Sequence, residues 1–90
     1  MTEQIIRNPQ GVTVWLDLLW RIRQLLERTL DHNLESAEDR ELRVKMERCN
    51  GTWLCDLEIP VNQWGVRGMS STREGAAYDV WWLACRSFGL

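Results

Sequence analysis

The chain has 90 residues, of which 44% are hydrophobic and 27% are charged, and its formal net charge is −2. This length suits one domain with one core, and the composition is that of a globular rather than a disordered protein. No apolar run approaches the roughly 18 residues of a membrane span, residues 1–10 lack the apolar region of a signal peptide, and the acidic balance disfavours a general nucleic-acid binder. We therefore expect one cytoplasmic domain over residues 1–90, with a flexible N-terminal segment at residues 1–11.

A long amphipathic helix is expected from Val12 to about His32. Apolar residues recur there at helical spacing and fill one broad face, whereas polar and charged residues fill the other. The apolar set includes Leu18, Leu19, Ile22, Leu25, Leu26 and Leu30. Trp20 is an exception, because it projects among the polar residues rather than among the leucines.

The segment from Glu27 to Glu41 is acidic, with six carboxylates and two arginines. Two interpretations of it stay open. In the first, it is a solvated connection between the helix and the next element. In the second, Glu35, Glu38 and Asp39 belong to an acidic patch that meets a basic partner.

Residues 42–59 are predicted to form a β-hairpin with a fixed register. Asn50-Gly51 is the preferred dipeptide of a type I′ turn, because both central positions of that turn need positive φ. A two-residue turn there pairs Cys49 with Thr52 and determines every later pair. The predicted pairs are Met46–Cys55, Val44–Leu57 and Leu42–Ile59 on an apolar face, and Lys45–Asp56 and Arg43–Glu58 on a charged face.

The three cysteines suit a reducing compartment, because an odd number cannot pair completely. The hairpin register places Cys49 on the charged face and Cys55 on the apolar face, so these two cannot bind one metal ion. Adding Cys85 and His32 gives no recognisable ligand spacing. We expect no metal site and no cofactor.

A third strand is expected from Trp64 to Met69, and it should be irregular because Gly65 and Gly68 interrupt it. Residues 71–74 are predicted to form a capping box, with Ser71 as the cap of a helix from about Thr72 to Ser87. The element order α-β-β-β-α predicts an α+β fold, in which two helices pack on one face of a three-stranded antiparallel sheet.

Several aromatic residues fall outside the predicted core. The core stripe of the closing helix consists of Ala77, Val80, Trp81, Ala84 and Phe88. Trp82 turns away from this stripe with Tyr78 one turn earlier, as Trp20 does on the first helix. Such rings are contacts for a partner, where Trp and Tyr are enriched, or they lie flat on neighbouring side chains, or a loop or terminus covers them. Trp53 faces Arg48 across the hairpin, which predicts a cation–π pair.

No catalytic constellation is recognisable in the sequence. His32 lies in the acidic segment with no Cys or Ser placed near it, and Ser71 is accounted for by helix capping. Gly65 and Gly68 are not followed by the Lys-Ser/Thr of a phosphate-binding loop. We therefore expect a protein that is not an enzyme.

From Val66 to Ala84 a Gly-containing strand leads through Ser71 into an alanine-bearing helix, and with the α-β-β-β-α order this stretch resembles the double-stranded RNA-binding domain. In that family the start of the last helix carries lysines that bind phosphates. The matching positions are Thr72, Arg73 and Ala76, of which Arg73 alone is basic. The resemblance implies an alternative function in nucleic-acid binding through Arg67, Arg73, Arg43 and Lys45.

In its small size, acidic charge and surplus of aromatic residues, the whole chain is similar to small phage and prophage accessory proteins, including anti-CRISPR proteins. The resemblance implies a non-enzymatic protein-binding module that inhibits a bacterial defence complex by covering part of its surface. The expected contacts are Trp20, Tyr78, Trp82, Glu35, Glu38 and Asp39. A structural homodimer through the same tryptophans is another hypothesis, whereas a membrane partner is not expected.

Overall fold

The computed structural model describes residues 12–88, so the segment expected to be flexible, residues 1–11, lies outside the described residues. The first helix, α1, spans Val12–Asp31, and the closing helix, α2, spans Arg73–Ser87. Four strands lie between them: β1 (Ser36–Asp39), β2 (Leu42–Cys49), β3 (Thr52–Ile59) and β4 (Trp64–Ser70). A short 3₁₀ turn, Pro60–Asn62, joins β3 to β4.

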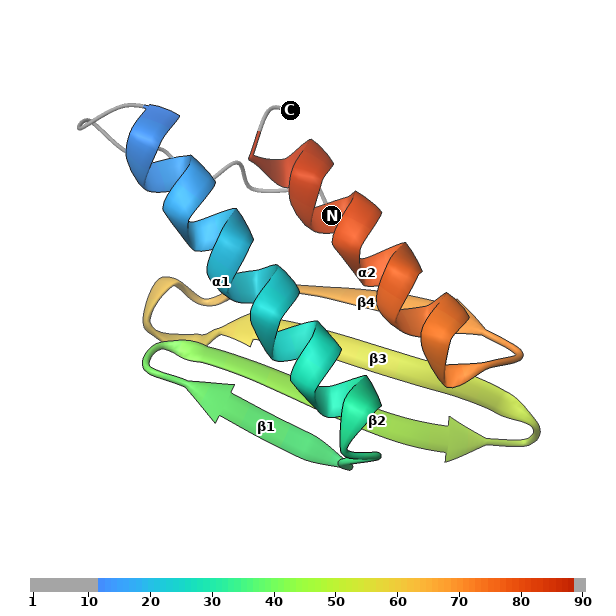
Figure 1. The fold of residues 1–90 in the computed structure, drawn as a ribbon. Coiled ribbons are helices and arrows are strands. Elements are labelled where there is room, and N and C mark those ends of the chain that lie inside the picture. The colour runs from blue at the N-terminus through green and yellow to red at the C-terminus, as the bar shows by residue number, and fades with distance from the viewer. Residues whose placement is uncertain (1–11, 89–90) are drawn as a thin grey trace.

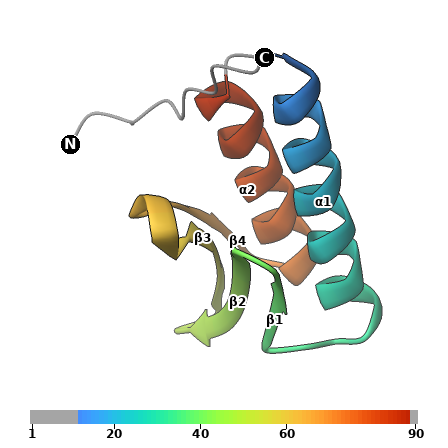
Figure 2. The same ribbon diagram turned by 90° about the vertical axis from the view of Figure 1, so that its left-hand side faces the viewer.

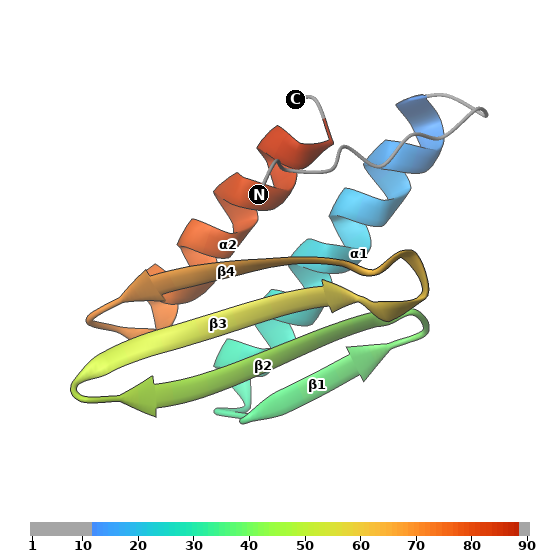
Figure 3. The same cartoon turned by 180° about the vertical axis from the view of Figure 1, so that it is seen from behind.

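The four strands form one antiparallel sheet in the order β1-β2-β3-β4. Both helices lie on the same face of this sheet and run antiparallel to each other (Figures 1 and 2). Helix α1 packs over β1 and β2, and α2 packs over β3 and β4. No helix of residues 12–88 lies on the opposite face of the sheet, which is turned toward the viewer in Figure 3. The expected α+β class is therefore confirmed, with both helices on one face.

The hairpin register predicted from the sequence is confirmed. Cys49 pairs with Thr52, and the predicted pairs follow in the observed register: Arg43–Glu58, Val44–Leu57, Lys45–Asp56 and Met46–Cys55. Asn50 and Gly51 have φ values of 53° and 79°, which a type I′ turn requires. As a result, Cys55 is buried and Cys49 is exposed, on opposite faces of the sheet.

The prediction of three strands is wrong, because the acidic segment contributes a fourth. Residues Ser36–Asp39 pair with β2 along the edge of the sheet. Ala37 is the buried residue of this strand and faces the helices, while Glu38 projects from the other face. A single small apolar side chain gives no periodic signal, so the sequence pattern does not predict a strand this short. Charged side chains suit an edge strand because they discourage pairing with other chains.

The sheet and the two helices enclose one hydrophobic core. Its fully buried members come from every layer and include Ile22, Leu42, Val44, Leu57, Ile59 and Val80. Trp64, at the start of β4, is 6% exposed, and its ring stacks on that of Phe88 with centroids 5.4 Å apart. The apolar face of the hairpin is therefore covered by helices, as the alternation of its side chains predicts.

Strand β4 is regular, contrary to the expectation that its glycines would interrupt it, since it pairs with β3 from Trp64 to Ser70. Gly68 instead allows α2 to approach the strand closely. A Cβ atom on Gly68 would lie only 2.8 Å from the backbone nitrogen of Val80. The glycine therefore serves helix packing rather than a break in the strand.

The capping residue of α2 is also one position later than predicted. Thr72, in extended conformation, accepts a hydrogen bond on its Oγ1 from the Gly75 backbone N–H at 2.9 Å. Ser70 takes a different part in the turn, because its Oγ accepts from the Thr72 N–H. The expected box between Ser71 and Glu74 therefore does not form, and Thr72 replaces Ser71 as the cap.

Candidate protein-binding face

Three large aromatic side chains are exposed on the helices, on the side away from the sheet. The exposed fractions are 62% for Trp20, 61% for Tyr78 and 52% for Trp82. Tyr78 and Trp82 are one turn apart on α2, and their rings make an edge-on contact with centroids 6.0 Å apart and an interplanar angle of 81°. Within residues 12–88 each of these side chains is more than half exposed, so none of them belongs to the core. We call these three residues the aromatic face.

Helical periodicity explains why these rings point outward. Leu19 and Ile22 are buried against the sheet, and Trp20 follows Leu19 by about 100° of rotation. In α2, Ala77 and Val80 are buried and Tyr78 and Trp82 lie on the outer side. The sequence therefore identified all three members of this surface correctly from periodicity alone.

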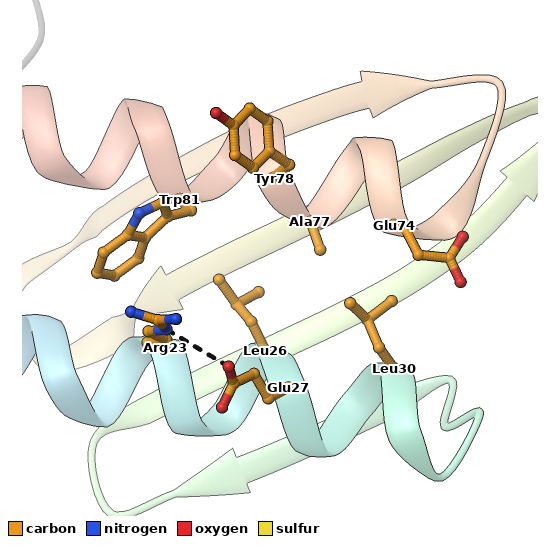
Figure 4. A pocket seen from close by; sticks show the side chains of 8 residues that line it. All are labelled: Arg23, Leu26, Glu27, Leu30, Glu74, Ala77, Tyr78 and Trp81. Carbon is orange, nitrogen blue, oxygen red and sulfur yellow. Dashed lines mark hydrogen bonds and ion pairs between the residues drawn. The ribbon is translucent and has the colours of Figure 1, made fainter.

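A shallow groove runs between α1 and α2 on the same side of the molecule (Figure 4). Its volume is about 290 Å³. The apolar residues that line the groove are Leu26, Leu30, Ala77 and Trp81. The polar residues that line it are Arg23, Glu27, Glu74 and Tyr78. Arg23 and Glu27 pair across one helical turn at 3.4 Å. Tyr78 belongs to both the groove and the aromatic face, whereas Trp20 and Trp82 do not line the groove.

Trp81 was expected in the core, but it is only partly buried and lines the groove. The sequence pattern missed this, because a helical wheel shows the side of α2 that faces α1 but not how deeply the two helices pack. Leu30 was likewise read as core and is partly exposed in the groove.

The acidic residues expected at the site lie elsewhere and are largely engaged. They belong to β1 and the residue before it, at the sheet edge beneath α1 and away from α2. Glu38 accepts a hydrogen bond from Arg43 Nε at 3.2 Å, and Asp39 pairs with Arg21 Nε at 3.5 Å. Glu35 uses its backbone carbonyl to accept from the Met46 N–H. The structure therefore does not bring Glu35, Glu38 and Asp39 together with the aromatic face.

Arg21 links α1 to the turn between β1 and β2. Its Nη1 lies 3.1 Å from Glu41 Oε1, and the hydrogen bond that Arg21 donates lowers the pKa of the Glu41 carboxyl. The same bond raises the pKa of Arg21 further above its ordinary value. Arg28, about two turns further along α1, donates to the Glu38 carbonyl at 2.7 Å. The acidic segment is thus fastened to α1 by two arginines.

Three of the four basic residues proposed for nucleic-acid binding lie on the face of the sheet without helices. Arg43 and Lys45 come from β2 and Arg67 from β4. Carboxylates neutralise most of this charge, since Arg67 forms two hydrogen bonds to Asp56, at 2.7 and 3.1 Å, and Arg43 contacts Glu38 and Glu58. The strands therefore present alternating charges rather than a basic surface.

Arg73, the fourth basic candidate, makes contacts that stabilise the fold. One of its terminal nitrogens, Nη2, donates to the carbonyls of Thr29 and Leu34, at 3.0 and 2.9 Å. Its guanidinium also lies over the Trp53 ring, 5.2 Å from the centroid. Trp53 does oppose Arg48 in the hairpin, but the cation–π partner is Arg73, which corrects the predicted pair.

Reactive groups are sparse among residues 12–88. Burial raises the pKa of the Cys55 thiol to about 12 and also raises that of Cys85, so both thiols stay protonated at neutral pH. His32 is exposed. The described residues contain no cluster of three or more His, Cys, Asp or Glu side chains that could hold a metal ion. The helices that the structure describes are too short or too polar for a membrane span.

Comparison of the chain with protein-family models, curated proteins and solved structures gave no significant match. The function must therefore be argued from the surface itself.

Proposed function

We propose that this chain is a non-enzymatic protein-binding module whose contact surface is the aromatic face together with the interhelical groove. One observation supports it above the others: three aromatic side chains, each more than half exposed, lie on the same outer side of two packed helices. Exposed aromatic residues of this kind are typical of interface hot spots. Folding does not explain them, because the core of the described residues is complete without them.

We propose further that the bound partner is a bacterial defence complex, which the chain inhibits. The support for this step is the resemblance to phage accessory proteins alone. Covering a partner's surface requires an interface and no active site, which is compatible with the sparse reactive chemistry described above. Nucleic-acid binding is the less favoured function. Arg73 is engaged in the fold, and the charges around Arg43 and Arg67 are paired with carboxylates.

The experiment is affinity capture from a bacterial lysate with the tagged chain, followed by identification of the bound proteins. Wild type should retain a defined partner that Trp20→Ala and Trp82→Ala each lose. Met69→Ala is the matched control, because Met69 is 61% exposed but lies on the sheet face away from the helices. Equal retention by all four proteins, or no partner at all, contradicts the proposal.

Light scattering over a dilution series distinguishes a homodimer through the aromatic face from binding of another protein. A dimer that Trp20→Ala and Trp82→Ala dissociate would mean that the rings are already occupied by a second copy. A monomer at tens of micromolar would leave the aromatic face free for another protein.

A further inference from the structure

We propose that the groove between α1 and α2 accepts an amphipathic α-helix of the partner, with a basic residue at the end near Glu74. This inference rests on the proposed function and specifies the partner's shape and charge. The groove's dimensions, its uneven charge and the state of the sheet edges support it.

The first argument is length. Figure 4 shows Arg23 and Trp81 at one end of the groove and Leu30 and Glu74 at the other. From Arg23 to Leu30 is two turns of α1, or about 10 Å at the helical rise. A helix lying along the groove would place side chains i, i+3 or i+4, and i+7 over this distance, which is the usual anchor spacing of helix-in-groove recognition.

The second argument is that the groove offers no backbone partner to an extended peptide. Its walls are helices whose backbone groups bond within each helix, and strand addition would need a free sheet edge instead. Both edges are partly occupied: the Glu38 carbonyl of β1 accepts from Arg28, and the Met69 N–H of β4 donates to Asp79 Oδ2 at 3.1 Å. A helical ligand carries its own backbone hydrogen bonds, so it can cover Leu30 and Trp81 without leaving polar groups unpaired.

The third argument is charge. Arg23, at one end, is neutralised by Glu27. Glu74, at the other end, makes no ion pair among the described residues, and Figure 4 shows its carboxylate turned away from the groove floor. The Tyr78 ring lies one turn further along α2 and offers a face to a cation. A Lys or Arg side chain is the complement of this end.

The test is a displayed library of peptides long enough for about four helical turns, randomised at every position and selected on the full chain. Enriched peptides should carry apolar residues at i, i+3 or i+4, and i+7, with Lys or Arg near one terminus. Glu74→Gln should weaken their binding about two- to fivefold, as expected for an exposed ion pair. Glu47→Gln, on the helix-free sheet face, is the matched control and should leave binding unchanged.

Leu30→Gln, which makes the groove floor polar, should weaken binding about tenfold or more. Tyr78→Ala, on the exposed rim, is the second variant in case Leu30→Gln disturbs the fold. Peptides without helical periodicity, or peptides indifferent to Glu74→Gln and Tyr78→Ala, would overturn the inference. If a lysate partner still depends on Trp20 and Trp82 in that case, the proposed function stands and the groove inference alone fails. If peptides bind the groove as expected but no lysate partner is captured, the groove inference stands and the proposed function fails.

Discussion

Arg73 joins three parts of the chain that are distant in sequence. Its guanidinium binds the carbonyls of Thr29, in the last turn of α1, and of Leu34, just beyond that helix, and it lies over Trp53 of β3. Hydrogen bonds from a charged donor contribute about 1.5–3 kcal/mol, and a carbonyl that loses its partner bears a further cost. Arg73→Ala should therefore lower the free energy of unfolding by about 2–3 kcal/mol, measured by urea denaturation.

Arg73→Lys should recover less than half of that loss, because an ammonium group cannot reproduce both the planar stacking and the two carbonyl bonds. Arg48→Ala is the control, since Arg48 is exposed beside the same ring and should change stability by less than about 0.5 kcal/mol. A larger effect of Arg48→Ala than of Arg73→Ala would show that the cation–π partner is the one expected from the sequence.

The Arg21–Glu41 pair predicts a pH dependence with a definite sign. The pKa of Glu41 is lower in the folded chain than its ordinary value of about 4.3, because Arg21 hydrogen-bonds the carboxylate. A carboxyl with a depressed pKa stabilises the fold above its ordinary pKa, and this contribution is lost as pH falls through the lower value. The Glu41 side chain is 38% exposed, so solvent screening keeps the contribution small.

Arg21→Gln should therefore be less stable than wild type at pH 7, and the difference should shrink below about pH 4. Urea denaturation at pH 7, 5, 4 and 3 measures this. Arg23→Gln removes a more exposed pair with Glu27 and should cost little at pH 7. A difference between Arg21→Gln and wild type that is constant with pH would show that Arg21 acts through packing alone.

At the scale of elements, the hairpin of β2 and β3 shows how far sequence can determine structure. Gly51 has a φ of 79°, so Gly51→Val should cost about 1–3 kcal/mol, because a β-branched residue resists that conformation. Val44→Asp should cost more, since Val44 is fully buried. Lys45→Glu should cost only about 0.2–1 kcal/mol, because Lys45 is exposed opposite Asp56.

Thermal melts of these variants, with Asn50→Asp as a turn-compatible control, measure the ranking. Equal damage from Lys45→Glu and Val44→Asp would mean that the helix-free face is buried in solution. That result would redirect attention from the helices to the sheet as the interface.

Elements were predictable in proportion to their length and periodicity. Helix α1 has five turns of apolar repeats and the hairpin has two independent faces, so each leaves one consistent solution. Strand β1 has four residues and one inward apolar side chain, Ala37, so β2 and Arg21 and Arg28 of α1 hold it in place. The groove could not be predicted, because its shape depends on how closely α1 and α2 pack. The residue pattern of a single helix carries no information on that distance.

At the scale of the whole molecule, the two outer faces differ in how their side chains are satisfied. The sheet face pairs its charges across strands, with Glu38, Arg43 and Glu58 in one row and Asp56 with Arg67 in the next. The helix face exposes large rings with few polar partners. Charges that pair with one another favour a solvated surface, whereas exposed aromatic area favours burial against another molecule. The proposed interface is therefore on the helices.

This division predicts opposite mutational effects for two tryptophans. Trp64 is 6% exposed and stacks on Phe88, so Trp64→Ala should cost about 3–5 kcal/mol through lost burial and a cavity. Trp20 is 62% exposed, so Trp20→Ala should change the free energy of unfolding by less than about 0.5 kcal/mol while abolishing partner capture. Urea denaturation at two protein concentrations measures both. A Trp20→Ala cost that approaches the Trp64→Ala cost, and grows with protein concentration, would show that Trp20 is buried against a second copy of the chain, because only association makes stability concentration-dependent.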